Sequence, residues 1–288
     1  MGTEKRERQK ANREAKLAAQ AAEEAKQKRI RFIRNVVILV AAIIVTGFLL
    51  SALSGCSSSD SEGVGTDGGS TTAAPGDGGT ASETADGLAF GTGECPPADG
   101  VDEPVIDFDD APQRCIDPDK AYVAEIETSL GRVTVELDTD RTPLTTNNFV
   151  ALSRFGYYDG TTLFRTEART GIIQGGSPHT QDNTDPGPGY TIPDESLPFS
   201  SAAYAPGALA MARTAAPDSA GAQFFLLANE GGAYLGDQAQ LGESAGSYVV
   251  FGRTTAGLDV LEKIAALDDG SGAPSTPVSI TGVTITER

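Results

Sequence analysis

The 288-residue sequence is poor in the side chains that metal sites and nucleophilic catalysis most often use. It has one histidine, His179, and three cysteines, none of them in a CxxC spacing. A zinc site needs several Cys or His ligands, and a Ser-His-Asp triad or a Cys-His pair needs a histidine beside its nucleophile. These shortages argue against all three kinds of site. We expect His179 to be a solvated loop residue without a catalytic role.

Basic residues are scarce after residue 35. The first 35 residues hold 11 of the 22 Lys and Arg and 5 of the 40 Asp and Glu, which gives a net charge of +6. The remainder holds 11 basic and 35 acidic residues and carries −24, so the whole chain carries −18. This acidic body argues against nucleic acid as a partner. Apolar residues (39%) and charged residues (22%) are close to globular averages, and the length allows a sizeable core.

Charge is absent altogether from Val36 to Leu53, an apolar run of 18 residues. As a helix this run would reach about 27 Å, near the roughly 30 Å hydrocarbon thickness of a bilayer. Lysines and arginines crowd the residues before it and almost none follow directly after it, so the positive-inside rule predicts a cytoplasmic N-terminus and an extracytoplasmic body.

The apolar run ends in Leu53-Ser54-Gly55-Cys56, which resembles a bacterial lipobox. Cys56 is therefore a candidate for lipidation after cleavage. The charged region of 34 residues before the run is long for a signal peptide, which favours an uncleaved anchor instead. Either alternative attaches the body to membrane lipid.

The segments on either side of the apolar run lack large apolar residues. Residues 4–31 are rich in helix formers but have no heptad pattern, so we expect a solvated helix, with contact to anionic headgroups as the alternative. Residues 57–93 are mostly Gly, Ser, Thr, Ala and Asp, which indicates a flexible, acidic linker.

Cys95 and Cys115 follow the linker. Outside the membrane an oxidised pair is expected, and it would leave Cys56 unmatched. The alternative is two unrelated free thiols.

Alternation of apolar and polar residues begins at Tyr122. It predicts a β-hairpin in which the turn Ser129-Leu130-Gly131 joins Tyr122–Glu127 to Arg132–Leu137. Further short apolar runs bounded by Gly, Pro, Asp or Asn predict strands at Thr161–Arg165, Gly171–Gly175, Ala208–Met211, Gln223–Leu227, Tyr248–Arg253 and Val278–Thr286.

Two helices are expected among these strands. Thr142-Pro143 has the pattern of an N-cap followed by proline, and Gly156 ends that helix. The second spans about Leu258–Leu267. The fold class we predict is mainly β: a closed antiparallel eight-stranded barrel with two capping α-helices.

Several of these segments together resemble one known family. The elements GRVTVEL, TPLTTNNFVALSRFGYYDGTTLFR, IIQGG, GALAMARTAAPDSAGAQFFLL and YVVFGRTTAGLDVLEKI are similar, in order and spacing, to cyclophilin-type peptidyl-prolyl cis-trans isomerases. The match covers the whole segment from Tyr122 to Glu287. The cysteine-bounded segment, the basic arm and the apolar run resemble membrane-attached members from actinobacteria.

The resemblance implies a reaction without a covalent step. An X-Pro amide resists rotation with a barrier of about 18–20 kcal/mol, and a fixed cationic donor favours the twisted amide by hydrogen bonding to its pyramidal nitrogen. By resemblance this donor is Arg165, and Arg169 is a competitor with poorer spacing. Gln174 would bind the substrate backbone and hold Arg165 in place.

The resemblance also implies an apolar pocket for the proline ring. Phe225 would form its floor, with Leu235 and Met211 beside it. Ala212 and Arg213 would follow on the peptide-binding edge. The remaining candidates for substrate binding are Ile172, Tyr234 and Tyr248.

Two departures from the family pattern lie near this site. Phe164 stands where the family has a histidine, and Gly171 where it has an aromatic residue, on a stretch one residue longer than is common. They favour a second hypothesis, a non-catalytic proline-peptide binding module or envelope scaffold. Both hypotheses imply proline-containing polypeptides as partners, a monomer, and neither a metal nor a cofactor.

The organisation we expect has five parts: a basic cytoplasmic arm at 1–34, an anchor or lipoprotein signal at 35–55, a flexible linker at 56–93, a cysteine-bounded extension at 94–118, and a cyclophilin-like isomerase domain at 119–288 in the extracytoplasmic space.

Overall fold

The computed structural model describes residues 82–83 and 89–288. The predicted arm, the apolar run Val36–Leu53, Cys56 and most of the linker lie outside the described residues. Within the described part no helix is long and apolar enough to cross a bilayer.

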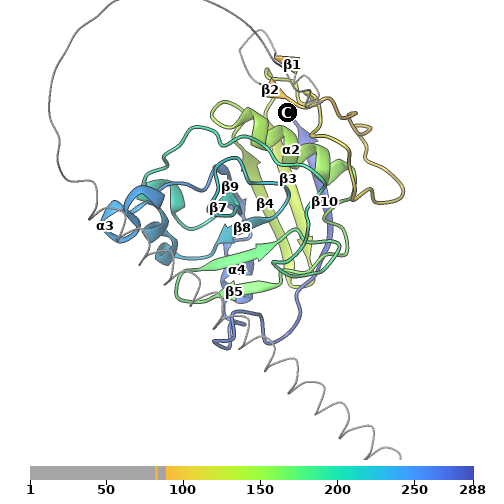
Figure 1. Ribbon diagram of the computed structural model, residues 1–288. Coiled ribbons are helices and arrows are strands. Elements are labelled where there is room, and N and C mark those ends of the chain that lie inside the picture. The colour runs from red at the N-terminus through yellow and green to blue at the C-terminus, as the bar shows by residue number, and fades with distance from the viewer. Residues whose placement is uncertain (1–81, 84–88) are drawn as a thin grey trace, which may run out of the picture. The chain divides into compact units, whose positions relative to one another are not determined.

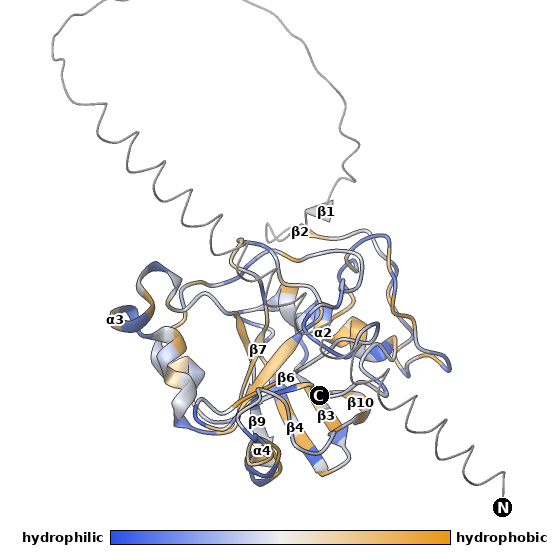
Figure 2. Cartoon of the chain, turned by 60° about the horizontal axis from the view of Figure 1, so that its bottom comes forward, coloured by the Kyte–Doolittle hydropathy of each residue, from blue (hydrophilic) through white to orange (hydrophobic). Residues whose placement is uncertain are grey.

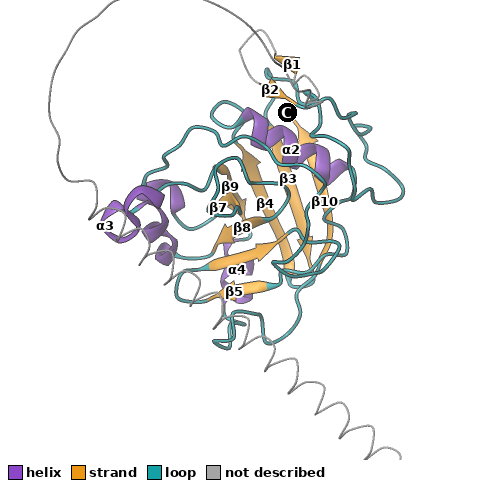
Figure 3. Cartoon of the chain, viewed as in Figure 1, coloured by secondary structure: helices purple, strands orange, loops and turns teal. Residues whose placement is uncertain are grey.

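The described chain has more strands than helices, and long loops join them (Figure 3). The strands are β1 (Ser82–Glu83), β2 (Ala89–Phe90), β3 (Tyr122–Thr128), β4 (Gly131–Leu137), β5 (Arg165–Glu167), β6 (Ile172–Gly175), β7 (Ala208–Met211), β8 (Phe224–Leu227), β9 (Val250–Ala256) and β10 (Ile280–Glu287). The helices are α2 (Pro143–Arg154), α3 (Gln238–Leu241) and α4 (Leu258–Ala265), with 3₁₀ turns η1 (Ser201–Tyr204), η2 (Glu230–Gly236) and η3 (Gly242–Ser244).

Eight of the strands form one curled antiparallel sheet in the order β10-β3-β4-β9-β7-β8-β6-β5 (Figure 1). The predicted hairpin is confirmed, with Ala124 opposite Val135 in its register. The run predicted as a strand at Thr161–Arg165 is shifted, because β5 begins only at Arg165. Thr162 instead makes an isolated bridge to Ser279, just before β10.

The two faces of the central strands bury two different apolar clusters. Along β8, Phe224 belongs to the larger cluster inside the curled sheet, and Phe225 to a smaller cluster on the opposite face. This division follows from the two-residue period of a strand. Figure 2 shows strand β7 in hydrophobic colours, and all four of its residues are buried.

Helix α2 begins at Pro143, as predicted, but its N-terminus is capped by a different residue. The hydroxyl of Thr142 donates to the carbonyl of Asp138 (2.8 Å) and makes no cap hydrogen bond. The buried carboxylate of Glu195 accepts from the backbone N–H of Leu144 (2.8 Å) and of Thr145 (2.7 Å), and from the Thr145 hydroxyl (2.6 Å). A distant glutamate thus satisfies the free N–H groups of this helix.

Both helices bury apolar residues in the larger cluster, among them Phe149 and Leu152 of α2 and Leu261 and Ile264 of α4. Helix α2 packs against β10, and α4 against β4, β5 and β6. The predicted second helix is confirmed, although it ends two residues earlier than expected.

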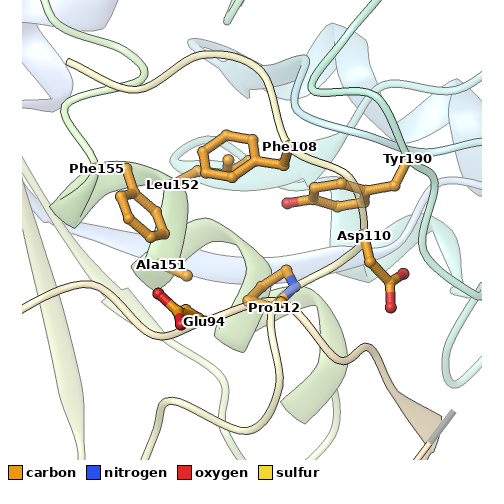
Figure 4. A pocket seen from close by; sticks show the side chains of 9 residues that line it. Glu94, Phe108, Asp110, Pro112, Ala151, Leu152, Phe155 and Tyr190 are labelled. Carbon is orange, nitrogen blue, oxygen red and sulfur yellow. The ribbon is translucent and has the colours of Figure 1, made fainter.

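The predicted disulfide between Cys95 and Cys115 is present, with their Cα atoms 5.4 Å apart. The structured chain starts before it, since Phe90 in β2 is already buried. Figure 4 shows how the extension covers α2: Phe108 and Pro112 lie across a small cavity from Leu152 and Phe155. The rings of Phe108 and Phe155 are 5.0 Å apart, so the extension is packed onto the domain rather than trailing from it.

His179 lies exposed in a loop, as predicted, but its ring also contacts two carboxylates. Its ring nitrogens lie 3.0 Å from a carboxylate oxygen of Asp107 in the extension and 3.2 Å from one of Asp185. Partial burial opposes the charged imidazole, but the hydrogen bonds and charges of the two aspartates outweigh it and raise the His179 pKa. We call this arrangement the His179 clasp, since it ties the extension to the loop after β6.

Candidate functional site

Three predicted site residues form a row across neighbouring strands. Arg165 of β5 lies opposite Gln174 of β6 in the sheet register, and Gln174 lies opposite Phe225 of β8. The row continues to Ala210 of β7. Because residues directly opposite each other share a face of the sheet, the register alone brings the guanidinium, the amide and the ring together.

The Arg165 guanidinium is held on two sides. Its Nη1 donates to the Gln174 side-chain oxygen at 2.9 Å. Its Nε donates to Glu167 Oε1 at 3.1 Å, and its Nη2 donates to the same oxygen. The Gln174 amide nitrogen in turn donates to the side chain of Gln223 (2.9 Å). Arg165 is therefore oriented, while its side chain remains 39% exposed and open to a ligand.

Glu167 is charged in this arrangement. Partial burial would raise the pKa of its carboxyl, but the hydrogen bond and charge of Arg165, together with a hydrogen bond from Thr170, hold the pKa below its ordinary value. Sequence reasoning missed Glu167 and Gln223. The signal for Glu167 was available, because a residue two positions after Arg165 on a strand faces the same side.

An apolar cluster adjoins the cation. Phe225, Ile172 and Leu235 are buried in it, and Tyr234, Tyr248 and Ala212 pack against it with partly exposed side chains. The rings of Phe225 and Tyr248 meet edge to face, with centroids 5.5 Å apart. The structure thus brings together six of the eight side chains predicted to bind substrate.

Two predicted substrate-binding side chains lie elsewhere. Met211 belongs to the larger interior cluster, because the alternation along β7 turns Ala210, not Met211, toward Phe225. The Arg213 side chain is only 8% exposed: it donates to the carbonyls of Ser247 and Ala216 and pairs with Asp194 at 3.3 Å. Its guanidinium ties loops together.

The turn between β5 and β6 explains Gly171. This residue has a φ of +72°, and a Cβ there would lie 2.7 Å from the backbone nitrogen of Asn229. No side chain fits that approach without a shift of the backbone. Arg169 lies exposed in the same turn, outside the paired register of β5 and β6. The site geometry therefore favours Arg165 over Arg169 as the functional cation.

The arrangement suits binding and polarisation rather than nucleophilic attack. A fixed guanidinium beside an apolar cluster can hold a ring and donate hydrogen bonds to a neighbouring atom. Among the residues that the structure describes, no group of three or more His, Cys, Asp or Glu could hold a metal ion. The cavity under the extension lies at a separate place, against α2.

Comparison with known proteins gives consistent results. Residues 123–285 match the family described as "Cyclophilin type peptidyl-prolyl cis-trans isomerase/CLD". The chain is 36% identical over 163 residues to a peptidyl-prolyl cis-trans isomerase, cyp18, of Streptomyces antibioticus, covering 56% of this chain and 93% of that protein. It is 31% identical over 168 residues to a peptidyl-prolyl cis-trans isomerase of Acinetobacter baylyi, covering 57% and 85%.

A similar solved structure is a cyclophilin-type isomerase of Cryptosporidium parvum, determined in the presence of the dipeptide Ala-Pro. It is 29% identical, with a TM-score of 0.48 and coverage of 58% of this chain and 99% of that one.

Proposed function

The chain belongs to the cyclophilin-type peptidyl-prolyl cis-trans isomerase family and is such an enzyme, and we propose that Arg165 is the residue that stabilises the twisted X-Pro amide. The observation that supports this role is the row of Arg165, Gln174 and Phe225 on adjacent strands. It joins an oriented cation to an apolar cluster at one face of the sheet.

Rotation about the X-Pro bond breaks the conjugation between nitrogen and carbonyl, and the nitrogen becomes pyramidal with a free lone pair. A guanidinium has five N–H donors, and three of those of Arg165 are used by Glu167 and Gln174. Two donors remain for the substrate. Since the lone pair exists only in the twisted state, a hydrogen bond to it lowers the barrier without tightening ground-state binding.

The apolar cluster is the proposed seat of the proline ring. Phe225 lies beside Gln174 in the register and is buried, so it would form the floor, with Ile172 and Leu235 as neighbours. Substrates are therefore proline-containing polypeptides, and the chain acts as a monomer. Tyr234, Tyr248 and Ala212 would contact residues flanking the proline.

For the fold itself we propose that the curled sheet closes into a barrel with α2 and α4 as caps. Support comes from backbone hydrogen bonds between residues 160–163 and 278–280, which lie next to the edge strands β5 and β10. Both helices contribute apolar residues to the interior cluster.

We further propose an extracytoplasmic, membrane-attached enzyme that assists the folding of exported proteins. The disulfide and the positive charge before Val36–Leu53 support this location. The Cys56→Ala variant distinguishes the two kinds of anchor. A lipoprotein would retain its N-terminal segment in this variant and gain mass, whereas an uncleaved anchor would leave the mature mass unchanged.

The alternative function is a non-catalytic module that binds proline peptides, favoured by Phe164 and by the loss of an aromatic wall at Gly171. A protease-coupled proline isomerisation assay on the full-length chain decides between them. Peptide binding without any rate enhancement would support the module and refute the catalytic role.

The same assay tests the arginine. Arg165→Ala should lower kcat/KM by about 10²–10³-fold, the usual effect of one preorganised donor. Arg165→Lys should restore only part of the rate, because an ammonium lacks the planar donor geometry. Arg169→Ala is the matched control and should keep the wild-type rate. Loss of activity in Arg169→Ala, with none in Arg165→Ala, would overturn the assignment.

A further inference from the structure

Arg165 has a carboxylate neighbour that the proposed mechanism does not use. Glu167 lies two residues along β5, on the same face of the strand, and its Oε1 accepts from both Nε and Nη2 of Arg165. Gln174 accepts from Nη1 on the other side. Contacts at three of the five donors fix both the position and the plane of the guanidinium.

Glu167 is itself held. Its second oxygen, Oε2, accepts from the Thr170 hydroxyl at 3.0 Å, and its backbone carbonyl accepts from the N–H of Gly171 at 2.8 Å. Both donors belong to the long turn between β5 and β6. One carboxylate oxygen therefore holds Arg165 while the other is tied to the turn, so the pair is built into the backbone geometry.

The charges around Glu167 come from three further elements. Asp268, in the loop after α4, repels the charge of the Glu167 carboxylate. Glu167 and Arg169 both act on Tyr234 of η2, where burial and Glu167 raise the tyrosine pKa and Arg169 lowers it. The direct hydrogen-bond partners remain Arg165 and Thr170. The closest opposite charge that Glu167 contacts is therefore the proposed catalytic cation.

We propose that Glu167 is a positioning residue for Arg165, which orients the guanidinium before substrate arrives. This inference rests on the proposed function of Arg165. A free arginine loses rotamer entropy whenever it is ordered at a binding site. Because Glu167 and Gln174 already order the Arg165 side chain in the folded protein, no further rotamer entropy is lost when substrate binds. The two remaining N–H donors then face the reacting amide in a fixed orientation.

The test compares Glu167→Ala and Glu167→Gln with wild type in the full-length chain, using the isomerisation assay. Glu167→Ala should lower kcat by about ten-fold with little change in KM, a smaller effect than losing the donor itself. Glu167→Gln keeps an acceptor oxygen at the same place and should recover part of the rate. A residue that only stabilised the turn would lower the melting temperature without this split between kcat and KM.

Glu127→Gln is the matched control. Glu127 is a strand glutamate of similar exposure that pairs with Arg132 in the β3–β4 hairpin, outside the site. It should leave kcat and KM unchanged.

A double-mutant cycle separates the two proposals. In an Arg165→Ala background, Glu167→Ala should cause no further loss, because its effect passes through the arginine. If Arg165→Ala is inactive but Glu167→Ala is as fast as wild type, the positioning role is refuted and the arginine mechanism stands. If Arg165→Ala keeps full activity, both the catalytic role of Arg165 and the positioning role of Glu167 are refuted.

Discussion

Replacing the buried Glu195 should destabilise the protein, because this carboxylate accepts three hydrogen bonds at the first turn of α2. Three hydrogen bonds to one charged acceptor, at about 1.5–3 kcal/mol each, set an upper bound. Burial raises the pKa of this carboxyl despite those bonds, so desolvation offsets part of their contribution. We expect Glu195→Ala to lower the free energy of unfolding by about 2–4 kcal/mol. For a domain of this size that corresponds to a fall of about 4–16 °C in Tm.

Thermal unfolding followed by circular dichroism, with urea unfolding beside it, measures both quantities. Glu195→Gln keeps one acceptor oxygen in nearly the same volume and should lose less. Glu262→Ala, at an exposed position of α4, is the control and should stay within about 0.5 kcal/mol of wild type. If Glu195→Ala unfolds at the same temperature as this control, the N-terminus of α2 does not depend on the carboxylate and the capping argument is wrong.

Reduction of the Cys95–Cys115 bond, which joins residues 20 apart, should lower stability by about 3 kcal/mol; an unchanged urea midpoint with reductant would contradict this. The raised pKa of His179 means that the clasp contributes fully below the unfolded value of about 6.5 and is lost as pH rises through the folded pKa. The Tm difference between wild type and His179→Gln should accordingly be largest near pH 5.5 and shrink toward pH 9, and a pH-independent difference would refute the ionic account. Gly171→Ala should cost about 1–3 kcal/mol in backbone strain plus the cost of the clash. Gly270 has a φ of +83° and open space around its Cβ position, so Gly270→Ala measures the backbone strain alone. Equal losses of stability in the two variants would show that the contact with Asn229 adds nothing to the cost of Gly171→Ala.

The alternation of apolar and polar residues was sufficient to predict the strands that bury only one face. The β3–β4 hairpin and the division of Phe224 and Phe225 between two faces follow from a period of two residues. Met211 shows where this fails. All four residues of β7 are buried, so hydrophobicity does not reveal which of them face the interior. The register with β8 decides it, and register depends on the whole sheet.

Several polar contacts between residues distant in sequence were not predicted, in contrast to the Cys95–Cys115 pair and the row of Arg165, Gln174 and Phe225. Glu195 caps a helix 50 residues earlier in the chain, and Arg213 is buried by a pairing with Asp194 in another loop. His179 meets Asp107 across 72 residues. Arg213 was predicted at a peptide-binding edge and Glu195 was assigned no role, because the burial of a polar side chain depends on whether a partner is brought within reach.

Arg165, the proposed catalytic cation, lies on an edge strand of the sheet. β5 has three residues and ends the sheet order, and on its outer side it is joined to the chain after α4 by the N–H of Thr166 to the carbonyl of Gly272 (3.3 Å) and the N–H of Ala168 to Asp268 (2.8 Å). Short edge segments open at lower free energy than central strands. Amide exchange at Thr166 should therefore be faster than at Leu226 in β8, and we expect the contacts of loop residues 268–275 to limit how often the strand that carries Arg165 opens.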